Sequence, residues 1–286
     1  MSSEWFVERQ HDAVSYGLRI SEPLHTEQTP YQSLQVFRSP HHGKVLILDD
    51  CVMLTELDEF IYHELLAHTA AQTLADPRDA LVIGGGDGGT VGELIKYPTL
   101  QVTQVEIDER VTRVCQEHFP ALTKGLDDPR VTLLFEDGLA YLDRQGDASL
   151  DLVVVDSTDP IGPAEGLITS DFYAKVARVL RDDGVMVAQS QSPFIHPQEL
   201  ETIVANLAQV FPQVWLYWGV CPSYLGALWT FVYASKTRRP LDGPGPQPGV
   251  HHTLNTKFYS AEVHRGLFAL PPFLQAKLPD GHPQRT

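Results

Sequence analysis

The segment that decides the fold runs from Ala80 to Gly89 and reads ALVIGGGDGG. Its first four residues form a short apolar run typical of a buried strand, and the glycines that follow interrupt that strand. Residues 90–97, which come next, are predicted to be helical. A strand, a glycine-rich turn and a helix in this order are typical of the first βαβ unit of a nucleotide-binding sheet.

The alternation of strand and helix continues downstream of this unit. The sequence predicts strands at 80–83, 101–106, 131–135, 151–156 and 185–189. It predicts helices between and after them at 90–97, 109–119, 171–180 and 198–211. This alternation predicts right-handed crossovers and a mostly parallel, Rossmann-like α/β sheet of the methyltransferase type with helices on both faces. Two further runs, 214–218 and 229–235, predict an antiparallel hairpin at the end of the sheet.

The chain upstream of this sheet has a different pattern. Apolar and polar residues alternate with a period of two at 14–20, 34–37, 45–48 and 52–54, with turn signals between these runs. This pattern predicts a small N-terminal antiparallel β-domain. A helix is predicted at 55–74, and we therefore expect a domain of residues 1–56 followed by one of residues 57–286. Near the C-terminus, 240–249 is a Pro/Gly-rich loop and 258–278 a tail with a short helical stretch.

Composition and charge restrict the possible functions. The chain has 286 residues, 43% of them hydrophobic, which excludes disorder as its main state. It contains 37 acidic and 21 Lys or Arg residues, and its net charge of −16 disfavours nucleic acid or an anionic membrane as a partner. It shows no membrane-spanning apolar run and no signal peptide, so we expect a cytoplasmic protein. Its three cysteines form neither a disulfide framework nor a CxxC metal site.

Five acidic residues fall at or just after the ends of predicted strands: Asp87, Glu106, Asp137, Asp156 and Asp159. A single acid at such a place is commonly a turn residue or a helix cap, and the acidic surplus is usually a solvated surface. The carboxyl ends of parallel strands meet at one rim of the sheet, where ligands bind. Carboxylates that converge there repel one another unless cations pair with them. The rim is therefore predicted to bind a positively charged ligand.

The glycine-rich turn suggests what that ligand is. Gly84, Gly86 and Gly89 satisfy the G-x-G-x-x-G pattern, and Glu106, 20 residues after Gly86, is placed to accept hydrogen bonds from ribose hydroxyls. Asp87 would repel the pyrophosphate of a dinucleotide but attract an adenosine with a cationic end. An S-adenosyl sulfonium is such a ligand, and decarboxylated S-adenosylmethionine fits better because it lacks the carboxylate. The pair Asp137-Gly138 suits the adenine edge.

Several motifs then match one known family in order along the chain: Tyr31-Gln32, DEFIYHE at 58–64, VIGGGDGG at 82–89, VEID at 105–108, EDG at 136–138, DSTDPIGPAEGL at 156–167 and PSY at 222–224. Over essentially its whole length the chain resembles the spermidine synthases, which are polyamine aminopropyltransferases. This resemblance implies a small N-terminal β-domain followed by a Rossmann-like catalytic domain, in agreement with the periodicity. It also implies a homodimer or homotetramer.

The resemblance implies transfer of an aminopropyl group from decarboxylated S-adenosylmethionine to putrescine, giving spermidine and 5′-methylthioadenosine. The donor is a co-substrate, and no cofactor is expected. By the family pattern, the residues that contact the nucleoside are Gln32, Asp87, Glu106, Asp137, Gly138 and Pro163. Those that surround the amines are Tyr62, His63, Asp87, Asp159 and Tyr224. Asp156 would be the proton acceptor, with Asp159 helping to orient the attacking amine.

Other functions remain as alternatives at this stage. The fold would also suit a methyltransferase that uses intact S-adenosylmethionine on a small amine, and aminopropyl transfer could go to cadaverine, agmatine or spermidine instead. A NAD-dependent oxidoreductase is disfavoured by Asp87, and a nucleoside-binding protein without activity is disfavoured because the acids are present. His63 and His68 are five residues apart, which places them about 140° apart around a helix, so no zinc site is expected.

Overall fold

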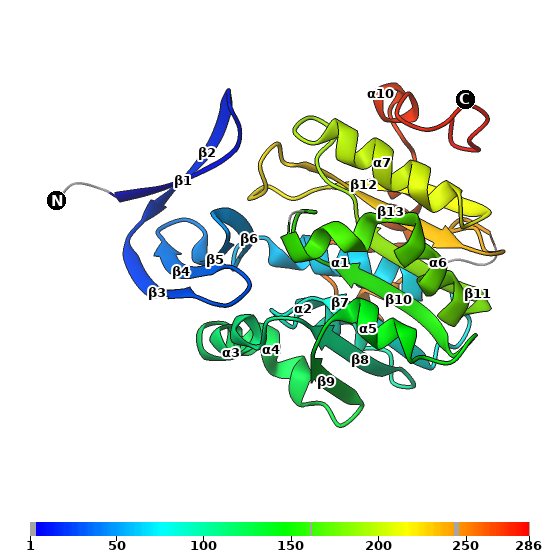
Figure 1. Ribbon diagram of the computed structural model, residues 1–286, viewed down its shortest axis with the longest axis horizontal. Coiled ribbons are helices and arrows are strands. Elements are labelled where there is room, and N and C mark those ends of the chain that lie inside the picture. The colour runs from blue at the N-terminus through cyan, green and yellow to red at the C-terminus, as the bar shows by residue number, and fades with distance from the viewer. Residues whose placement is uncertain (1–3, 161, 243–245, 286) are drawn as a thin grey trace.

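The computed structural model describes residues 4–160, 162–242 and 246–285. An N-terminal region of antiparallel strands lies at one end of the molecule, and a large sheet flanked by helices forms the rest (Figure 1). This arrangement confirms the fold predicted from the sequence periodicity. No helix in the described part of the chain is long and apolar enough to cross a bilayer.

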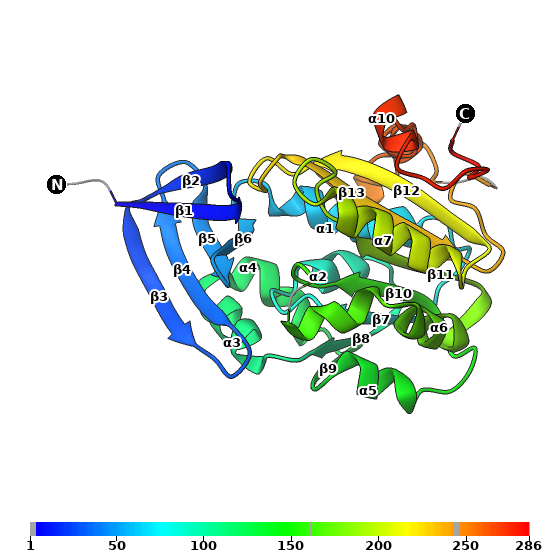
Figure 2. The same ribbon diagram turned by 45° about the horizontal axis from the view of Figure 1, so that its top comes forward.

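The N-terminal region consists of a two-stranded and a four-stranded antiparallel sheet. Its strands are β1 (Glu4–His11), β2 (Val14–Ile20), β3 (Glu22–Gln28), β4 (Ser33–Ser39), β5 (Gly43–Leu48) and β6 (Cys51–Thr55). The β1–β2 hairpin lies across one face of the β3–β6 sheet (Figure 2), where Phe6 and Leu18 pack with Phe37 and Ile47. The opposite face of the β3–β6 sheet packs on helix α3 (Glu109–His118) of the larger region.

The large sheet has seven strands in the order β12-β13-β11-β10-β7-β8-β9. They are β7 (Asp79–Gly84), β8 (Gln101–Glu106), β9 (Val131–Phe135), β10 (Leu150–Asp156), β11 (Leu180–Gln189), β12 (Gln213–Val220) and β13 (Leu228–Ser235). β7 to β11 run parallel, while β12 and β13 form an antiparallel hairpin at one edge, as the sequence predicts.

Helices cover both faces of this sheet. They are α1 (Glu59–Ala71), α2 (Gly89–Leu94), α3 (Glu109–His118), α4 (Pro120–Thr123), η1 (Lys124–Asp127), α5 (Gly138–Asp143), η2 (Gly162–Ile168), α6 (Ser170–Val179), α7 (Pro197–Ala208), α8 (Val250–Leu254), α9 (Ala261–Leu267) and α10 (Pro272–Gln275). Alternate residues of one strand serve the two faces: Val153 of β10 packs in the core under α5, α6 and α7, and Val154 in the core under α1 and α2. Burial on both faces explains why the central strands are continuous apolar runs.

The strand order reverses between β7 and β10. After β7 the chain adds β8 and β9 on one side, and then returns to add β10 and β11 on the other. Ligands of open parallel sheets bind in the crevice at such a reversal, outside the carboxyl ends of the strands. Here Gly84 ends β7 and Asp156 ends β10, and the two are register partners.

Helix α1 also holds the C-terminal segment. The buried carboxylate of Glu64 accepts hydrogen bonds of 2.8 Å from the backbone N–H groups of Lys257, Phe258 and Tyr259. Three donors satisfy an anion that would otherwise be costly to bury. The residues just before Glu64 on this helix, Tyr62 and His63, belong to the candidate site, so the tail is fastened beside that site.

Some elements differ from the sequence prediction. β8 and β9 have the predicted bounds, while β1, β3 and α5 were not predicted. β3 is a polar edge strand with the sequence EPLHTEQ, and it has no long apolar run to mark it. β1 was missed because its sequence, EWFVERQH, places acids and bases among the apolar residues.

Candidate active site

A cavity of about 150 Å³ lies at the reversal of the strand order. The described residues that line it include the glycine-rich turn and four of the five predicted acids, Asp87, Glu106, Asp137 and Asp156. The β-domain supplies another wall through residues of β5 and the β6 strand. The prediction that acids from several strand ends converge on one site therefore agrees with this geometry.

Asp156 is a nearly buried acid at the end of β10. It is 8% exposed, and its two oxygens accept hydrogen bonds from the Tyr62 hydroxyl at 2.8 Å and the Thr90 hydroxyl at 2.6 Å. Burial, followed by the nearby charge of Asp87, raises the pKa of Asp156 to about 6. Both donors are neutral, so this carboxylate has no cation of its own and can accept a proton near neutral pH.

Asp87 has a cationic partner. His63 lies between two carboxylates, with Nδ1 2.8 Å from Glu59 and Nε2 3.3 Å from Asp87. Burial by itself would lower the pKa of His63, but Asp87 and Glu59 outweigh it and raise that pKa well above 6.5. Burial would likewise raise the pKa of Asp87, but His63 and the backbone N–H of Gly89 outweigh it and lower that pKa. Asp87 therefore stays ionised beside a charged imidazolium.

Two glycines allow this close packing. Gly84 has a φ of +84°, and a Cβ on it would lie 2.2 Å from the carbonyl oxygen of Asp156. A Cβ on Gly89 would lie 2.3 Å from the ring of His63. The first and last glycines of the G-x-G-x-x-G pattern thus bring β7 against β10 and α2 against His63.

Glu106 ends β8 and faces the same cavity. It is 7% exposed, and its carboxylate accepts the backbone N–H of Asp108 at 2.8 Å. Burial raises the pKa of Glu106 to about 7, and the charges of Asp108, Asp156 and Asp87 add to the effect. A pair of ligand hydroxyls donating to this carboxylate would stabilise its ionised form.

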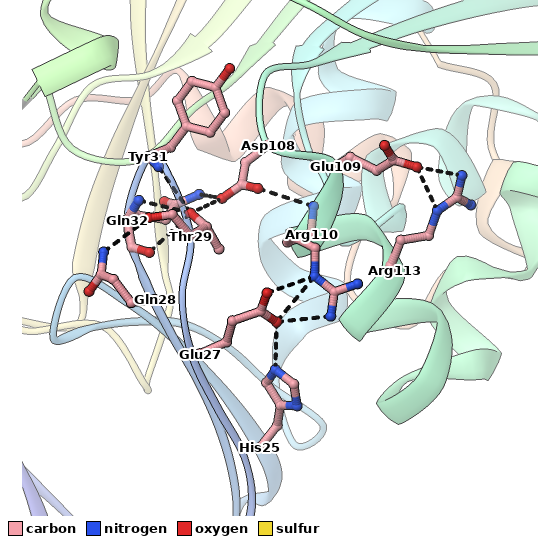
Figure 3. A network of polar contacts seen from close by, with 10 residues as sticks. All are labelled: His25, Glu27, Gln28, Thr29, Tyr31, Gln32, Asp108, Glu109, Arg110 and Arg113. Atoms are coloured by element: carbon pink, nitrogen blue, oxygen red, sulfur yellow. Dashed lines mark hydrogen bonds and ion pairs between the residues drawn. The ribbon is translucent and has the colours of Figure 1, made fainter.

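Hydrogen bonds and an ion pair fasten the β-domain to Asp108 and Arg110, which follow Glu106 in the chain (Figure 3). Gln32, which lines the cavity, donates through Nε2 to Asp108 at 3.0 Å, and the Thr29 hydroxyl donates to the same oxygen at 2.7 Å. Nearby, the Arg110 guanidinium binds the Glu27 carboxylate with contacts of 2.8 and 2.9 Å. Gln32 is therefore held beside Glu106 through Asp108.

Asp137 and Gly138, two further predicted nucleoside residues, also line the cavity. Asp137 is an exposed N-cap of α5 and accepts the backbone N–H of Leu139 at 2.8 Å, and Gly138 lines the cavity. Pro163 lies in η2, but its side chain is outside the described part of the structure. Asp137 thus has the helix-capping role that a single strand-end acid commonly has, and it lines the cavity as well.

A second, smaller cavity of about 30 Å³ adjoins the first, with Tyr62, Tyr224, Ser157, Thr158 and Met53 common to both. Its other described lining residues are Glu8, Gln10, Val52, Asp159, Gln189, Leu225 and Trp229. The rings of Tyr62 and Tyr224 meet edge to face with centroids 5.7 Å apart. Asp159 therefore lies around this second cavity and is absent from the described lining of the first, which contains Asp156.

Glu8 is a site residue that the sequence analysis missed. It is 2% exposed, and one carboxylate oxygen accepts the backbone N–H of Val52 at 3.0 Å. Burial raises the pKa of Glu8 to about 7, with the charge of Asp159 adding to the effect. A signal was present in the sequence, because Glu8 shares the inward face of β1 with the buried Phe6, and a carboxylate on an apolar strand face needs a partner.

The two cavities are lined by acids without basic side chains. Among their described lining residues there is no lysine or arginine. Within the described ranges, no group of three or more His, Cys, Asp or Glu residues is arranged to hold a metal ion. An acidic lining of this kind favours a positively charged ligand.

Comparison with family models identifies the chain. Residues 59–242 match the spermine/spermidine synthase domain, and residues 4–56 match the spermidine synthase tetramerisation domain. The chain belongs to the spermine/spermidine synthase family. The resemblance found in the sequence motifs is therefore confirmed.

Relatives in this family are similar over nearly their whole length. A polyamine aminopropyltransferase of Moorella thermoacetica is 43% identical over 276 residues, which cover 96% of each chain. One of Desulforudis audaxviator is 41% identical over 271 residues, covering 94% of this chain and 97% of the relative.

Solved structures of the family have the same fold. Spermidine synthase in complex with the transition-state analogue AdoDATO superposes with a TM-score of 0.93 at 31% identity, covering 97% of this chain and 96% of that one. The spermidine synthase of Thermotoga maritima gives a TM-score of 0.90 at 29% identity, covering 97% and 95%.

Proposed function

We propose that this protein transfers the aminopropyl group of decarboxylated S-adenosylmethionine to putrescine, giving spermidine and 5′-methylthioadenosine. Membership of the spermine/spermidine synthase family supports aminopropyl transfer. The observation that carries the proposal is the meeting of Asp87, Glu106 and Asp156 at one cavity whose described lining contains no lysine or arginine. Such a site favours a donor with a sulfonium and an ammonium and disfavours one with a carboxylate.

The donor would bind in the first cavity. Its ribose hydroxyls would donate to Glu106, and its adenine would lie against Asp137, Gly138 and Pro163. Gln32 would close the nucleoside side through its hydrogen bond to Asp108. Asp87, kept ionised by His63, would attract the ammonium of the aminopropyl group.

The reaction is a displacement at carbon. The nitrogen of putrescine attacks the methylene carbon next to the sulfonium, the carbon–sulfur bond breaks, and its electron pair stays on the neutral thioether. The donor thus brings its own leaving group, and the proposal requires no cofactor. The nitrogen must be unprotonated to attack.

Removing that proton is the main barrier that the protein can lower. An alkylamine resembles lysine, with a pKa near ~10.4, so its free base costs roughly 4–5 kcal/mol near pH 7. Asp156 would accept the proton, held in position by the hydroxyls of Tyr62 and Thr90. Burial of the amine between Tyr62 and Tyr224 would favour its neutral form further.

The other amine of putrescine would stay protonated and would anchor the substrate. In the second cavity, one carboxylate oxygen of Glu8 accepts the Val52 N–H, and the other has no hydrogen-bond partner among the residues that the structure describes, so we assign the remote ammonium to it. Asp159 adds negative charge in the same cavity, which we call the acceptor arm. We call the first cavity the donor cavity. The aromatic walls favour the cation as well as the methylene chain between the amines.

His63 would act through Asp87 instead of touching the amine. Both of its ring nitrogens are taken up by Glu59 and Asp87, and its side chain is only 3% exposed. It is therefore a poor receptor for the carboxylate of intact S-adenosylmethionine, which argues against methyl transfer. We assign His63 the role of holding Asp87 in place and ionised.

The test compares donors and acceptors directly. The protein is incubated with putrescine and either decarboxylated or intact S-adenosylmethionine, and the products are resolved by mass. We expect spermidine and 5′-methylthioadenosine from the decarboxylated donor only. A methylated amine from the intact donor, with no spermidine from the other, would overturn the proposal.

We further propose that residues 1–56 form an assembly domain and residues 57–286 the catalytic domain. The match of residues 4–56 to the spermidine synthase tetramerisation domain supports a homo-oligomer, either a dimer or a tetramer. We also place the enzyme in the cytoplasm, where its substrates would be made.

A further inference from the structure

One residue of the N-terminal hairpin contributes to the wall of the acceptor arm. Gln10 of β1 lines the second cavity, and its amide nitrogen donates to Asp159 at 3.0 Å. Its amide oxygen accepts from Nε2 of His196 at 2.9 Å. One side chain therefore links the first strand of the protein to two loops of the catalytic region.

These contacts fix both the position and the orientation of the Gln10 amide. The hydrogen bond from His196 identifies the amide oxygen and so turns the NH₂ group toward Asp159. The other oxygen of Asp159 accepts from Nε2 of Gln191, a fully buried residue, at 2.9 Å. Both oxygens of Asp159 thus already have amide donors, and Gln10 cannot leave without exposing one of them.

The second cavity relates Gln10 to the proposed amine anchor. Glu8 and Gln10 both come from β1 and both line this cavity, although the β1–β2 pairing is irregular between Glu8 and His11. An acceptor whose remote ammonium binds Glu8 would therefore share the cavity with the Gln10 amide. A triamine is longer than putrescine by one aminopropyl unit, which would have to occupy the place of this side chain.

We propose that Gln10 is the residue that determines acceptor length: it ends the acceptor arm and restricts the enzyme to diamines. This inference rests on the proposed function, because it concerns which amine is used in that same reaction. Gln10 acts by excluding longer acceptors, while the anchoring of the shorter one is left to Glu8.

The test measures kcat/KM for putrescine and for spermidine with decarboxylated S-adenosylmethionine as donor. In Gln10→Ala, we expect the ratio of spermidine to putrescine to rise at least tenfold, with spermine as the new product. His196→Ala, which frees the amide without removing it, should shift the ratio in the same direction but by less. Arg9→Ala is the matched control, since Arg9 is exposed on the outer face of the same strand, and its ratio should not change.

The outcomes separate this inference from the proposed function. If the wild type makes spermidine and the ratio in Gln10→Ala stays within twofold of it, Gln10 does not limit acceptor length. The same conclusion follows if the wild type already uses spermidine as well as putrescine, or if Gln10→Ala is folded by circular dichroism yet inactive on both acceptors. If no amine accepts an aminopropyl group from the donor in the wild type, it is the proposed function that fails.

Discussion

The two cavities of the site are built in different ways. The donor cavity lies at the ends of the parallel strands β7, β8 and β10, and its acids follow glycine and strand patterns within 73 residues, from Gly84 to Asp156. The acceptor arm combines β1, β6 and the loops after β10 and β12, and its Gln10–Asp159 bond joins residues 149 positions apart. The acids of the donor cavity are thus placed by the sheet, with the β-domain supplying a wall, while the acceptor arm also takes Glu8 and Gln10 from the N-terminal hairpin.

We expect the largest effect from a substitution of Asp156, the proposed proton acceptor. Asp156→Asn keeps the shape and the hydrogen bond from Thr90 but cannot take a proton. We expect kcat to fall about 10³-fold, which corresponds to about 4 kcal/mol. Steady-state kinetics at pH 7.5 measures this, with equilibrium binding of 5′-methylthioadenosine as the control. A variant with near-wild-type kcat would refute the proton-acceptor role.

The donor cavity should also carry a measurable cost in stability. The pKa of Glu106 is raised to about 7 in the folded protein, so the folded state binds its proton more tightly than the unfolded state. Its stabilising contribution is present below about pH 4.5 and is lost as the pH rises to about 7. Glu106→Gln should therefore gain up to about 3 kcal/mol over the wild type between pH 5 and pH 8.

Urea unfolding of both proteins at pH 5 and pH 8, without ligand, measures this difference. The expected sign is a wild type that weakens toward pH 8 relative to the variant. If the free energies of unfolding of the two proteins changed in parallel with pH, burial would not raise the pKa of Glu106.

The acceptor arm is tested by Glu8→Gln. Losing a charge-assisted contact to the remote ammonium should raise KM for putrescine about 30-fold, or about 2 kcal/mol. KM for the donor should stay unchanged, because Glu8 lines only the second cavity. An equal rise in both KM values would mean that the two cavities are not independent, and Arg9→Ala again serves as the control on the same strand.

We expect the smallest effect from a change at Glu59, which pairs with His63. Glu59→Gln removes one of the two carboxylates that keep His63 protonated. The positive charge of His63 lowers the pKa of Asp156, so a partly neutral His63 lets that pKa rise. The acid limb of the kcat/KM profile, expected near pH 6, should therefore move up by about half a pH unit. The pH profile of Glu109→Gln, a change at an exposed residue of α3, should match the wild type. An unshifted limb in Glu59→Gln would show that Glu59 does not act through His63.

The same contrast explains what the sequence could predict. The bounds of β8 and β9 were predicted because QVTQVE and VTLLF are short runs rich in β-branched and apolar residues. Asp87 and Glu106 were found from their spacing to the glycines, since local chain geometry decides where they point. Glu8 and Gln10 were missed because β1 is short of apolar residues and its partners are distant in sequence. Tertiary packing alone brings that strand to Asp159.

Helix α1 sets a tight limit on how this chain can vary. Tyr62 donates to Asp156, His63 contacts Asp87 of the glycine-rich turn, and Glu64 binds the C-terminal segment, all within one turn. Each added residue turns a helix by about 100°. A single insertion or deletion between Glu59 and Tyr62 would therefore turn all three side chains away from their partners. Substitutions in this helix leave the directions of the three side chains unchanged, whereas a change in its length by one residue does not.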